Sequence, residues 1–295
     1  MSAPDPVSPR DAVAPPDPVS APLPYRGIFG DPRPGRLAGL ALPPAPMPSH
    51  QGWRGLKAWR YVGVFGPELM ICLASVRIGP ARQSFWAVWD RTAQRLHERT
   101  RLGPGAVALS PGRACIDDRG IELDLRLEET SGIETVCRSG DSYAWTRKQG
   151  GIRAHGWITI EGRRRAIDAR AVVDDTAAYY QRHTRWRWSA GVGDARDGRR
   201  LAWNLVSGVN DPPRSSERTV WIDGVPTEVG PVTIDSQLTR VGGLRFAAER
   251  TRRHDQNLVL VRSSYRQPFG TFSGDLAGVS LASGYGVMEE HDVRW

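Results

Sequence analysis

The stretch Gly120–Glu129, GIELDLRLEE, alternates apolar and polar side chains without a break. Ile121, Leu123, Leu125 and Leu127 occupy every second position, and acidic or basic residues fill the positions between them. Successive side chains of a strand point to opposite faces of the sheet. The stretch therefore predicts a β-strand with one dry face and one face in water.

Segments on both sides of this stretch repeat the same rhythm. Short runs rich in β-branched and aromatic residues, separated by Gly, Pro or Asp-Gly, continue from residue 59 to the C-terminus. Strands this close in sequence leave no room for crossover helices, so the sheets should be antiparallel. The expected fold class is mainly β, with two antiparallel barrels or strongly curved sheets in tandem and few short helices.

One segment in the middle of the chain favours a helix. In residues 174–184, DDTAAYYQRHT, an Asp or Thr could cap a short run of good helix formers. A domain boundary is expected here. The predicted organisation is a disordered Pro/Ala-rich tail (1–24), an N-terminal barrel-like domain with an extended arm (25–175) and a C-terminal barrel-like domain (176–295). Three aromatic residues are expected to anchor the arm: Tyr25, Phe29 and Trp53.

The composition is that of an ordinary soluble protein, with 40% apolar residues and a mean hydropathy of −0.42. No run of 18 apolar residues predicts a membrane span, and the N-terminus lacks the pattern of a secretory signal. The odd count of three cysteines indicates reduced thiols in a cytoplasmic protein. No HxH, HExxH or CxxC motif is present, so neither a metal site nor a cofactor is expected.

The net charge of +8 raises the question of an anionic partner. Lys57 and Lys148 are the only lysines, so 38 of the 40 basic residues are arginines. Many of these arginines fall in expected hairpin tips, where charged side chains are usually solvated. We therefore expect no nucleic-acid partner, while contact with an anionic membrane surface stays open as the weaker alternative.

The last predicted strand carries two ionisable residues on its apolar side. Val287, Glu289, His291, Val293 and Trp295 share one face at a two-residue period. A buried carboxylate is costly unless it is paired or protonated. Either Glu289 pairs with His291 or an arginine and is structural, or it faces a cavity, where its pKa rises and it can donate a proton.

The second half of the chain also mixes aromatic residues with isolated polar ones. Such strands are typical of a pocket for a mostly apolar ligand, in which a few polar groups fix its orientation; they are equally typical of a core whose polar groups bond the backbone. The candidate ligand-binding residues are Trp186, Trp188, Trp203, Asn204, Trp221, Asp223 and His183. The candidate catalytic residues are Glu289, His291 and Glu217.

Three stretches carry a family resemblance: YYQRHTRWRWSAGVG (179–193), LAWNLVSGVND with SERTVWIDG (201–224) and the terminal GVMEEHDVRW (286–295). Together they resemble the proteins grouped as domain of unknown function 2804. More distantly, the chain is similar to tandem lipocalin-like proteins, among them carotenoid hydratases, tocopherol-cyclase-like enzymes and fungal pericyclases. This resemblance implies two barrel-like β domains with a ligand cavity in or between them, and it transfers no catalytic residue.

These observations favour a protein that binds a hydrophobic small molecule such as a lipid, terpenoid or polyketide. Cofactor-independent acid/base chemistry, for example hydration, isomerisation or cyclisation, is one hypothesis, with a carboxyl group as the proton donor and tryptophans facing the developing positive charge. A non-catalytic lipid carrier that uses the same cavity is the alternative.

Overall fold

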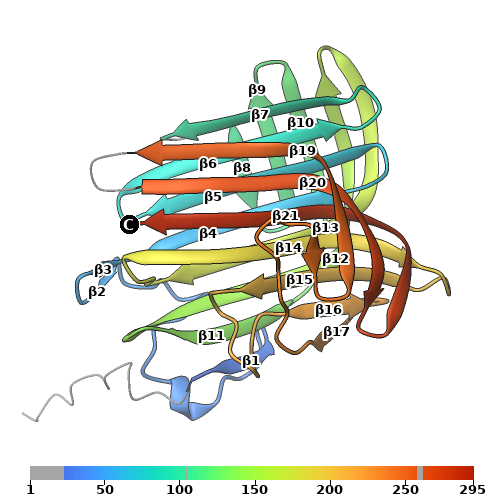
Figure 1. Cartoon of the computed structure of the whole chain (residues 1–295). Helices are drawn as coiled ribbons and strands as arrows, with labels where there is room; N and C mark the ends of the chain where they lie inside the picture. The colour runs from blue at the N-terminus through green and yellow to red at the C-terminus, as the bar shows by residue number, and fades with distance from the viewer. Residues whose placement is uncertain (1–22, 104, 258–261) are drawn as a thin grey trace, which may run out of the picture.

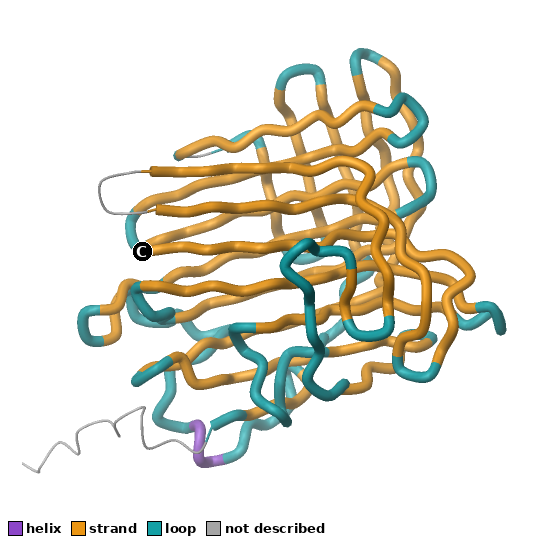
Figure 2. Tube along the Cα trace, viewed as in Figure 1, coloured by secondary structure: helices purple, strands orange, loops and turns teal. Residues whose placement is uncertain are grey.

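The computed structural model describes residues 23–103, 105–257 and 262–295. These residues form curved antiparallel sheets, as Figures 1 and 2 show, which confirms the predicted fold class. Within the described ranges, the only regular helix is the single 3₁₀ turn η2 (Gly35–Leu37). The predicted tail lies, up to residue 22, outside the described residues.

The first half of the chain forms an eleven-stranded sheet, here called the N-terminal sheet. Its main path runs β7-β6-β5-β4-β13-β12-β10-β9-β8, and β11 and β1 extend it beside β12. The strands are β1 (Tyr25–Ile28), β4 (Lys57–Phe65), β5 (Leu69–Ile78), β6 (Ala81–Asp90), β7 (Arg95–Leu102), β8 (Val107–Ser110), β9 (Arg113–Asp118), β10 (Ile121–Leu127), β11 (Ile133–Ser139), β12 (Ser142–Ile160) and β13 (Arg163–Ala178). The alternating stretch that opens the sequence analysis is β10, and its apolar side chains are all buried.

The second half forms the eight-stranded C-terminal sheet, ordered β17-β16-β15-β14-β21-β20-β19-β18. The strands are β14 (His183–Ala195), β15 (Arg200–Ser207), β16 (Thr219–Ile222), β17 (Val225–Glu228), β18 (Arg240–Val241), β19 (Leu244–Asn257), β20 (Arg262–Leu276) and β21 (Val279–Arg294). A small separate hairpin joins β2 (His50–Gln51) to β3 (Arg54–Gly55).

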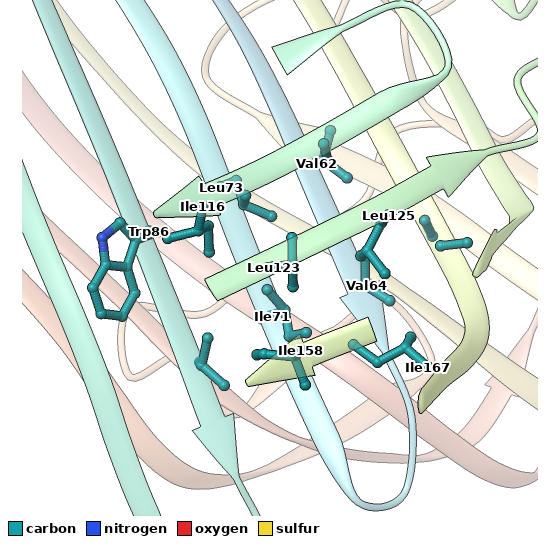
Figure 3. Close-up of a cluster of buried hydrophobic side chains, with 14 of the residues drawn as sticks. Val62, Val64, Ile71, Leu73, Trp86, Ile116, Leu123, Leu125, Ile158 and Ile167 are labelled. Atoms are coloured by element: carbon teal, nitrogen blue, oxygen red, sulfur yellow. The ribbon is translucent and has the colours of Figure 1, made fainter. Parts of the chain in front are cut away.

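Strands β4–β6 are buried on both faces over residues 61–65, 70–74 and 86–90, because these segments lie between two cores. On one face, Val62 and Val64 pack against β8–β10, where the N-terminal sheet curls back over itself (Figure 3). On the other face, Tyr61 and Phe65 pack against the C-terminal sheet. Figure 1 shows β19–β21, in orange and red, lying over this second face. Strands β4–β6, which form part of one wall of the space between the sheets, therefore pack against a hydrophobic core on their other face.

The predicted helix over residues 174–184 is wrong. Strand β13 continues to Ala178, and β14 begins at His183. Neither residue expected to cap a helix does so: Asp175 forms an ion pair with Arg60 at 2.8 Å, and the Thr176 hydroxyl donates to Asp174 at 2.9 Å. Asp174 itself forms an ion pair with Lys148 at 2.5 Å. Tertiary pairing with β4 and β12 therefore overrides the local helix preference.

The arm before β4 packs along one edge of the N-terminal sheet. Tyr25 is buried there, and the ring of Phe29 meets that of Trp145 at 5.9 Å between centroids, so both predicted anchors are confirmed. The third predicted anchor is wrong, because Trp53 is 69% exposed; only the Arg54 guanidinium lies over its ring.

Candidate functional site

A cavity lies between the two sheets, and we call it the inter-sheet cavity. The volume of this cavity is about 130 Å³. Strands β4, β5, β6, β12 and β13 supply one wall, and β14, β19, β20 and β21 supply the other. Partly exposed lining residues such as Trp59, Gln83 and Trp295 mark where the cavity reaches the surface.

Strand register places the lining residues of the N-terminal sheet in two rows. Directly paired positions give the rows Lys148–Asp174–Tyr61–Ala74–Phe85 and Thr176–Trp59–Val76–Gln83. The first row crosses from β12 to β6, which is four steps between neighbouring strands, or about 19 Å. The wall is thus charged on the β12–β13 side and apolar across β5 and β6.

The facing wall is built in the same way. Register aligns His254, Tyr265, His291 and Trp186 across β19, β20, β21 and β14. Aromatic and imidazole rings therefore follow one another across the sheet: the Tyr265 and His291 ring centroids are 5.2 Å apart, and those of His291 and Trp186 are 4.4 Å apart. This row faces the apolar strands of the opposite wall.

Glu289 lines this cavity and is buried. Its Oε1 accepts a hydrogen bond from the Trp186 indole at 2.9 Å, and its Oε2 accepts from the Tyr265 hydroxyl at 2.7 Å and the Gln267 amide at 3.0 Å. These three donors are neutral. Burial raises the pKa of Glu289 because it removes water from the carboxylate, although the bonds from Tyr265 and Trp186 oppose the shift. Three of the roughly four lone-pair sites are filled, so a site remains for a proton.

His291 stands two residues away on the same wall. Its Nε2 and the Ser263 hydroxyl are 2.7 Å apart. Burial lowers the pKa of His291 to about 3, and the charge of Arg252 adds to the effect. The imidazole is therefore neutral at neutral pH and acts as a hydrogen-bonding group. Among the described residues, the hydrogen-bond partners of Glu289 are Trp186, Tyr265 and Gln267. The first explanation given for that carboxyl, a pair with His291 or an arginine, therefore does not hold.

Glu217 belongs to a different, ionic corner of the cavity. Its carboxylate accepts a hydrogen bond from the Asn210 amide at 3.1 Å and lies 3.4 Å from the Lys148 ammonium, which also contacts Asp174 at 2.5 Å. Burial raises the pKa of Glu217, while the Lys148 charge opposes the shift. Burial also works against the charge of Lys148, but Asp174 and Glu217 outweigh it and raise its pKa. This corner therefore joins the two halves of the chain through buried charges.

Three large rings stack along the wall between these polar groups. Trp59 lies parallel to Trp186, with centroids 6.2 Å apart and planes 9° apart, and Tyr180 stacks on both. Edge-to-face contact between Tyr61 and Trp188, at 5.3 Å, extends the aromatic surface. Such faces carry negative electrostatic potential and favour a cationic or polarised group.

The other candidates from the sequence lie in three kinds of place. Trp188 lines the cavity, and Asn204 behind it accepts the Trp188 indole N–H at 2.8 Å. Trp203 and Trp221 are buried outside the cavity, in the core beyond the C-terminal sheet and in the core between the sheets. Asp223 and His183 lie near the surface: Asp223 (φ 49°) and Gly224 (φ 81°) form the β16–β17 turn, and His183 contacts Asp292 at 2.8 Å.

Several residues that line the cavity were not among the candidates from the sequence. Tyr265, Tyr61, Trp59 and Arg252 come from strands far apart in the chain, and only the register between β19, β20 and β21 and the facing β4 brings them together. The sequence signal was present in one case: Arg252 alternates with His254 on the inward face of β19, in a part of the strand that is otherwise polar.

Metal binding and membrane crossing are two other functions on which the structure bears. Across the described ranges, no group of three or more His, Cys, Asp or Glu side chains is placed to hold a metal ion. Over the same part of the chain, no helix has the length and apolarity that crossing a membrane requires.

The fold and cavity define a class of protein: two curved antiparallel sheets that enclose an aromatic cavity. Residues 106–295 match the family described as "Domain of unknown function (DUF2804)", and the chain belongs to that family. This match confirms the resemblance inferred from the three stretches of the second half. Among curated proteins, no sequence matches the chain.

Solved structures similar to this chain share little sequence with it. A protein described as an AttH candidate of Nitrosomonas europaea aligns at 13% identity over 85% of this chain and 98% of its own, with a TM-score of 0.48. Kievitone hydratase from Nectria haematococca aligns at 11% identity over 79% of this chain and 88% of its own, also at 0.48. CghA in complex with Sch210972 aligns at 10% identity over 81% and 88%, at 0.44. No residue of this chain takes a role from these names.

Proposed function

We propose that this protein binds a largely apolar small molecule in the inter-sheet cavity and exchanges a proton with it at Glu289. The observation that carries the proposal is a buried carboxyl group on the wall of an aromatic cavity, whose hydrogen-bond partners in the described part of the chain are all neutral donors. Cavities lined by aromatic and aliphatic groups with a few fixed polar atoms are typical binding sites for small organic ligands.

The chemistry follows from the protonation state of that carboxyl. Burial raises the pKa of Glu289 and so favours the neutral acid. In this proposal the neutral acid gives its proton to an alkene carbon or carbonyl oxygen of the ligand. The ligand's electron pair forms the new bond to hydrogen, leaving a carboxylate on Glu289 and a positive charge on the ligand. The faces of Trp186 and Trp59 stabilise that charge. Water then adds and returns a proton to Glu289, which is hydration, or a neighbouring C–H does so, which is isomerisation.

His291 and Ser263 have a positioning role in this proposal. The imidazole is neutral, so it fixes the Ser263 hydroxyl without supplying a charge. A hydroxyl held in this way can orient a water molecule or an oxygen atom of the ligand beside the rings.

A carrier without catalytic activity is the second candidate. The observation that favours it is the full set of hydrogen bonds around Glu289, which would also be needed simply to hold a buried carboxyl in place. Both candidates place the ligand in the same cavity, and they differ in what happens to it there.

Solvent extraction of purified protein followed by mass spectrometry separates the two. Wild type and Glu289→Gln are produced in the same cells, and their bound small molecules are identified. An enzyme should yield different species, with unconverted substrate accumulating on Glu289→Gln. The same molecule on both proteins would establish the carrier, and no ligand on either, together with no binding of an added apolar probe, would contradict the proposal as a whole.

A further inference from the structure

We propose that the inter-sheet cavity recognises a carboxylate head group at Arg252, so that the ligand is an amphipathic acid. This inference rests on the proposed function and narrows it to a class of ligand. It starts from Arg252 of β19, which lines the cavity and whose side chain is only 3% exposed.

The guanidinium of Arg252 packs against two aromatic rings. Its central carbon lies 4.0 Å from the centroid of the Phe85 ring, which belongs to the N-terminal sheet, and 4.8 Å from that of Tyr265. The two ring centroids are 6.0 Å apart, so the rings lie on adjacent sides of the guanidinium. The Nη2 atom donates to the Thr100 hydroxyl at 2.7 Å. With two sides packed and one corner tethered, the group is held in one orientation before any ligand arrives.

The remaining donors of Arg252 are poorly satisfied. Its Nη1 is buried and has no hydrogen-bond partner among the described residues. Its Nε lies 3.7 Å from a carboxylate oxygen of Glu98, which is an ion-pair distance but too far for a hydrogen bond. Burial raises the pKa of Glu98, while the Arg252 charge opposes the shift. A buried cation with an unfilled donor is costly, and an anion that occupies this position would remove the cost.

Arg218 shows what a purely structural buried arginine looks like in this chain. It is 1% exposed, and Nε, Nη1 and Nη2 each donate to a backbone carbonyl: Val229 at 3.2 Å, Asp211 at 2.9 Å and Pro212 at 2.7 Å. Arg252 is 2% exposed, and within the described ranges it makes one hydrogen bond, to Thr100. The difference between the two indicates a binding role for Arg252.

Neighbouring residues on β19 extend the polar end of the cavity. His254 and Gln256 follow Arg252 on the same face and line the cavity with it, and the buried Nε2 of His254 also lacks a partner in the described part of the chain. Val76 and Ile78 of β5 line the same cavity with aliphatic side chains. A ligand with an oxyanion at one end and a hydrocarbon body beyond it matches both features.

The number of free donors selects among anions. The Nη1 of Arg252 and the Nε2 of His254 suit the two oxygens of a carboxylate. A phosphate dianion calls for more donors and more positive charge. A bound carboxylate also affects the proposed chemistry. The Arg252 charge lowers the pKa of Glu289. A bound carboxylate offsets that charge and therefore favours the protonated form of Glu289.

Matched fluorescent probes test the inference. cis-Parinaric acid and its methyl ester share one hydrocarbon body and differ in head-group charge. Wild type should bind the acid at least tenfold more tightly than the ester at neutral pH. Arg252→Gln should lose that preference while binding the ester as wild type does, and Arg252→Lys, which keeps the charge, should retain part of it.

Controls separate this inference from the proposed function and from misfolding. Arg91→Gln removes an arginine that joins the same two sheets through Glu249, outside the cavity, and it should leave the acid-to-ester ratio unchanged. Ester binding by Arg252→Gln reports that the cavity is intact. Equal binding of acid and ester by wild type overturns the inference and leaves the proposed function standing, whereas failure of both probes overturns the proposed function itself.

Discussion

At the scale of single residues, the proposed function depends on Glu289, whose buried carboxyl group lies on strand β21 and lines the inter-sheet cavity. The inward face of Val287, Glu289, His291 and Val293 follows from a two-residue period, and the structure buries or lines the cavity with each of them. What the period does not reveal is the partner of each side chain. Trp186, Tyr265 and Gln267 reach Glu289 from other strands, and no local pattern encodes that meeting.

Glu289 should make stability depend on pH in a definite direction. A carboxyl whose folded-state pKa is raised contributes stability that is fully present below its unfolded pKa, about 4.3, and lost as pH rises through the folded value. Glu289→Gln removes this dependence. Urea unfolding between pH 4.5 and 8 should therefore show the variant gaining free energy of unfolding relative to wild type as pH rises. A difference that stays flat or falls would contradict the raised pKa; other buried carboxyls are common to both proteins and cancel.

The ionic corner should be sensitive to loss of its cation. Lys148→Met leaves Asp174 and Glu217 buried side by side without a counter-charge, and removing one member of a buried ion pair typically costs about 3–5 kcal/mol. Denaturant unfolding measures the loss. Arg153→Ala, at an exposed pair with Asp168, is the control and should leave stability nearly unchanged. Equal effects of the two substitutions would show that the corner is not stabilising.

At the scale of elements, alternation identified the strands, but capping signals misled. Residues 174–184 contain good helix formers, yet β13 is extended there because Arg60 and Lys148 bind the two aspartates from β4 and β12. Three glycines within strands of the C-terminal sheet are a second feature at this scale. Gly191 of β14 pairs with Gly286 of β21, which in turn pairs with Gly270 of β20, so a row without side chains spans these three neighbouring strands of the C-terminal sheet.

This glycine row should be intolerant of a methyl group. A Cβ at Gly191 would lie 2.7 Å from the Tyr285 carbonyl oxygen and against the ring of Trp203. Gly191→Ala should therefore lower the free energy of unfolding by about 1–3 kcal/mol, as overpacking does elsewhere. Gly230→Ala is the matched control, since a Cβ there meets nothing within 4 Å, and it should change stability by less than about 0.5 kcal/mol. Thermal or urea unfolding of both variants decides the point.

At the scale of the whole molecule, the sequence predicted two curved antiparallel sheets and left their arrangement open. Strands β4 and β14 have aromatic residues on the faces that meet, and this alone does not tell a core from a cavity. The division of the chain into domains at residue 175 stays a prediction. The chain changes sheets between Ala178 and His183, so both halves contribute to one site, and neither contains it alone.

Titration of the cavity with a neutral probe tests the central claim, that an apolar ligand binds between the sheets. Ala74 lines the cavity, and Ala74→Phe fills it, whereas Ala247→Phe adds the same ring at an exposed position of β19. Wild type and Ala247→Phe should bind the methyl ester of cis-parinaric acid saturably at one site, and Ala74→Phe should bind it at least tenfold more weakly while keeping the same circular dichroism. Undiminished binding by Ala74→Phe, or none by wild type, would contradict the account.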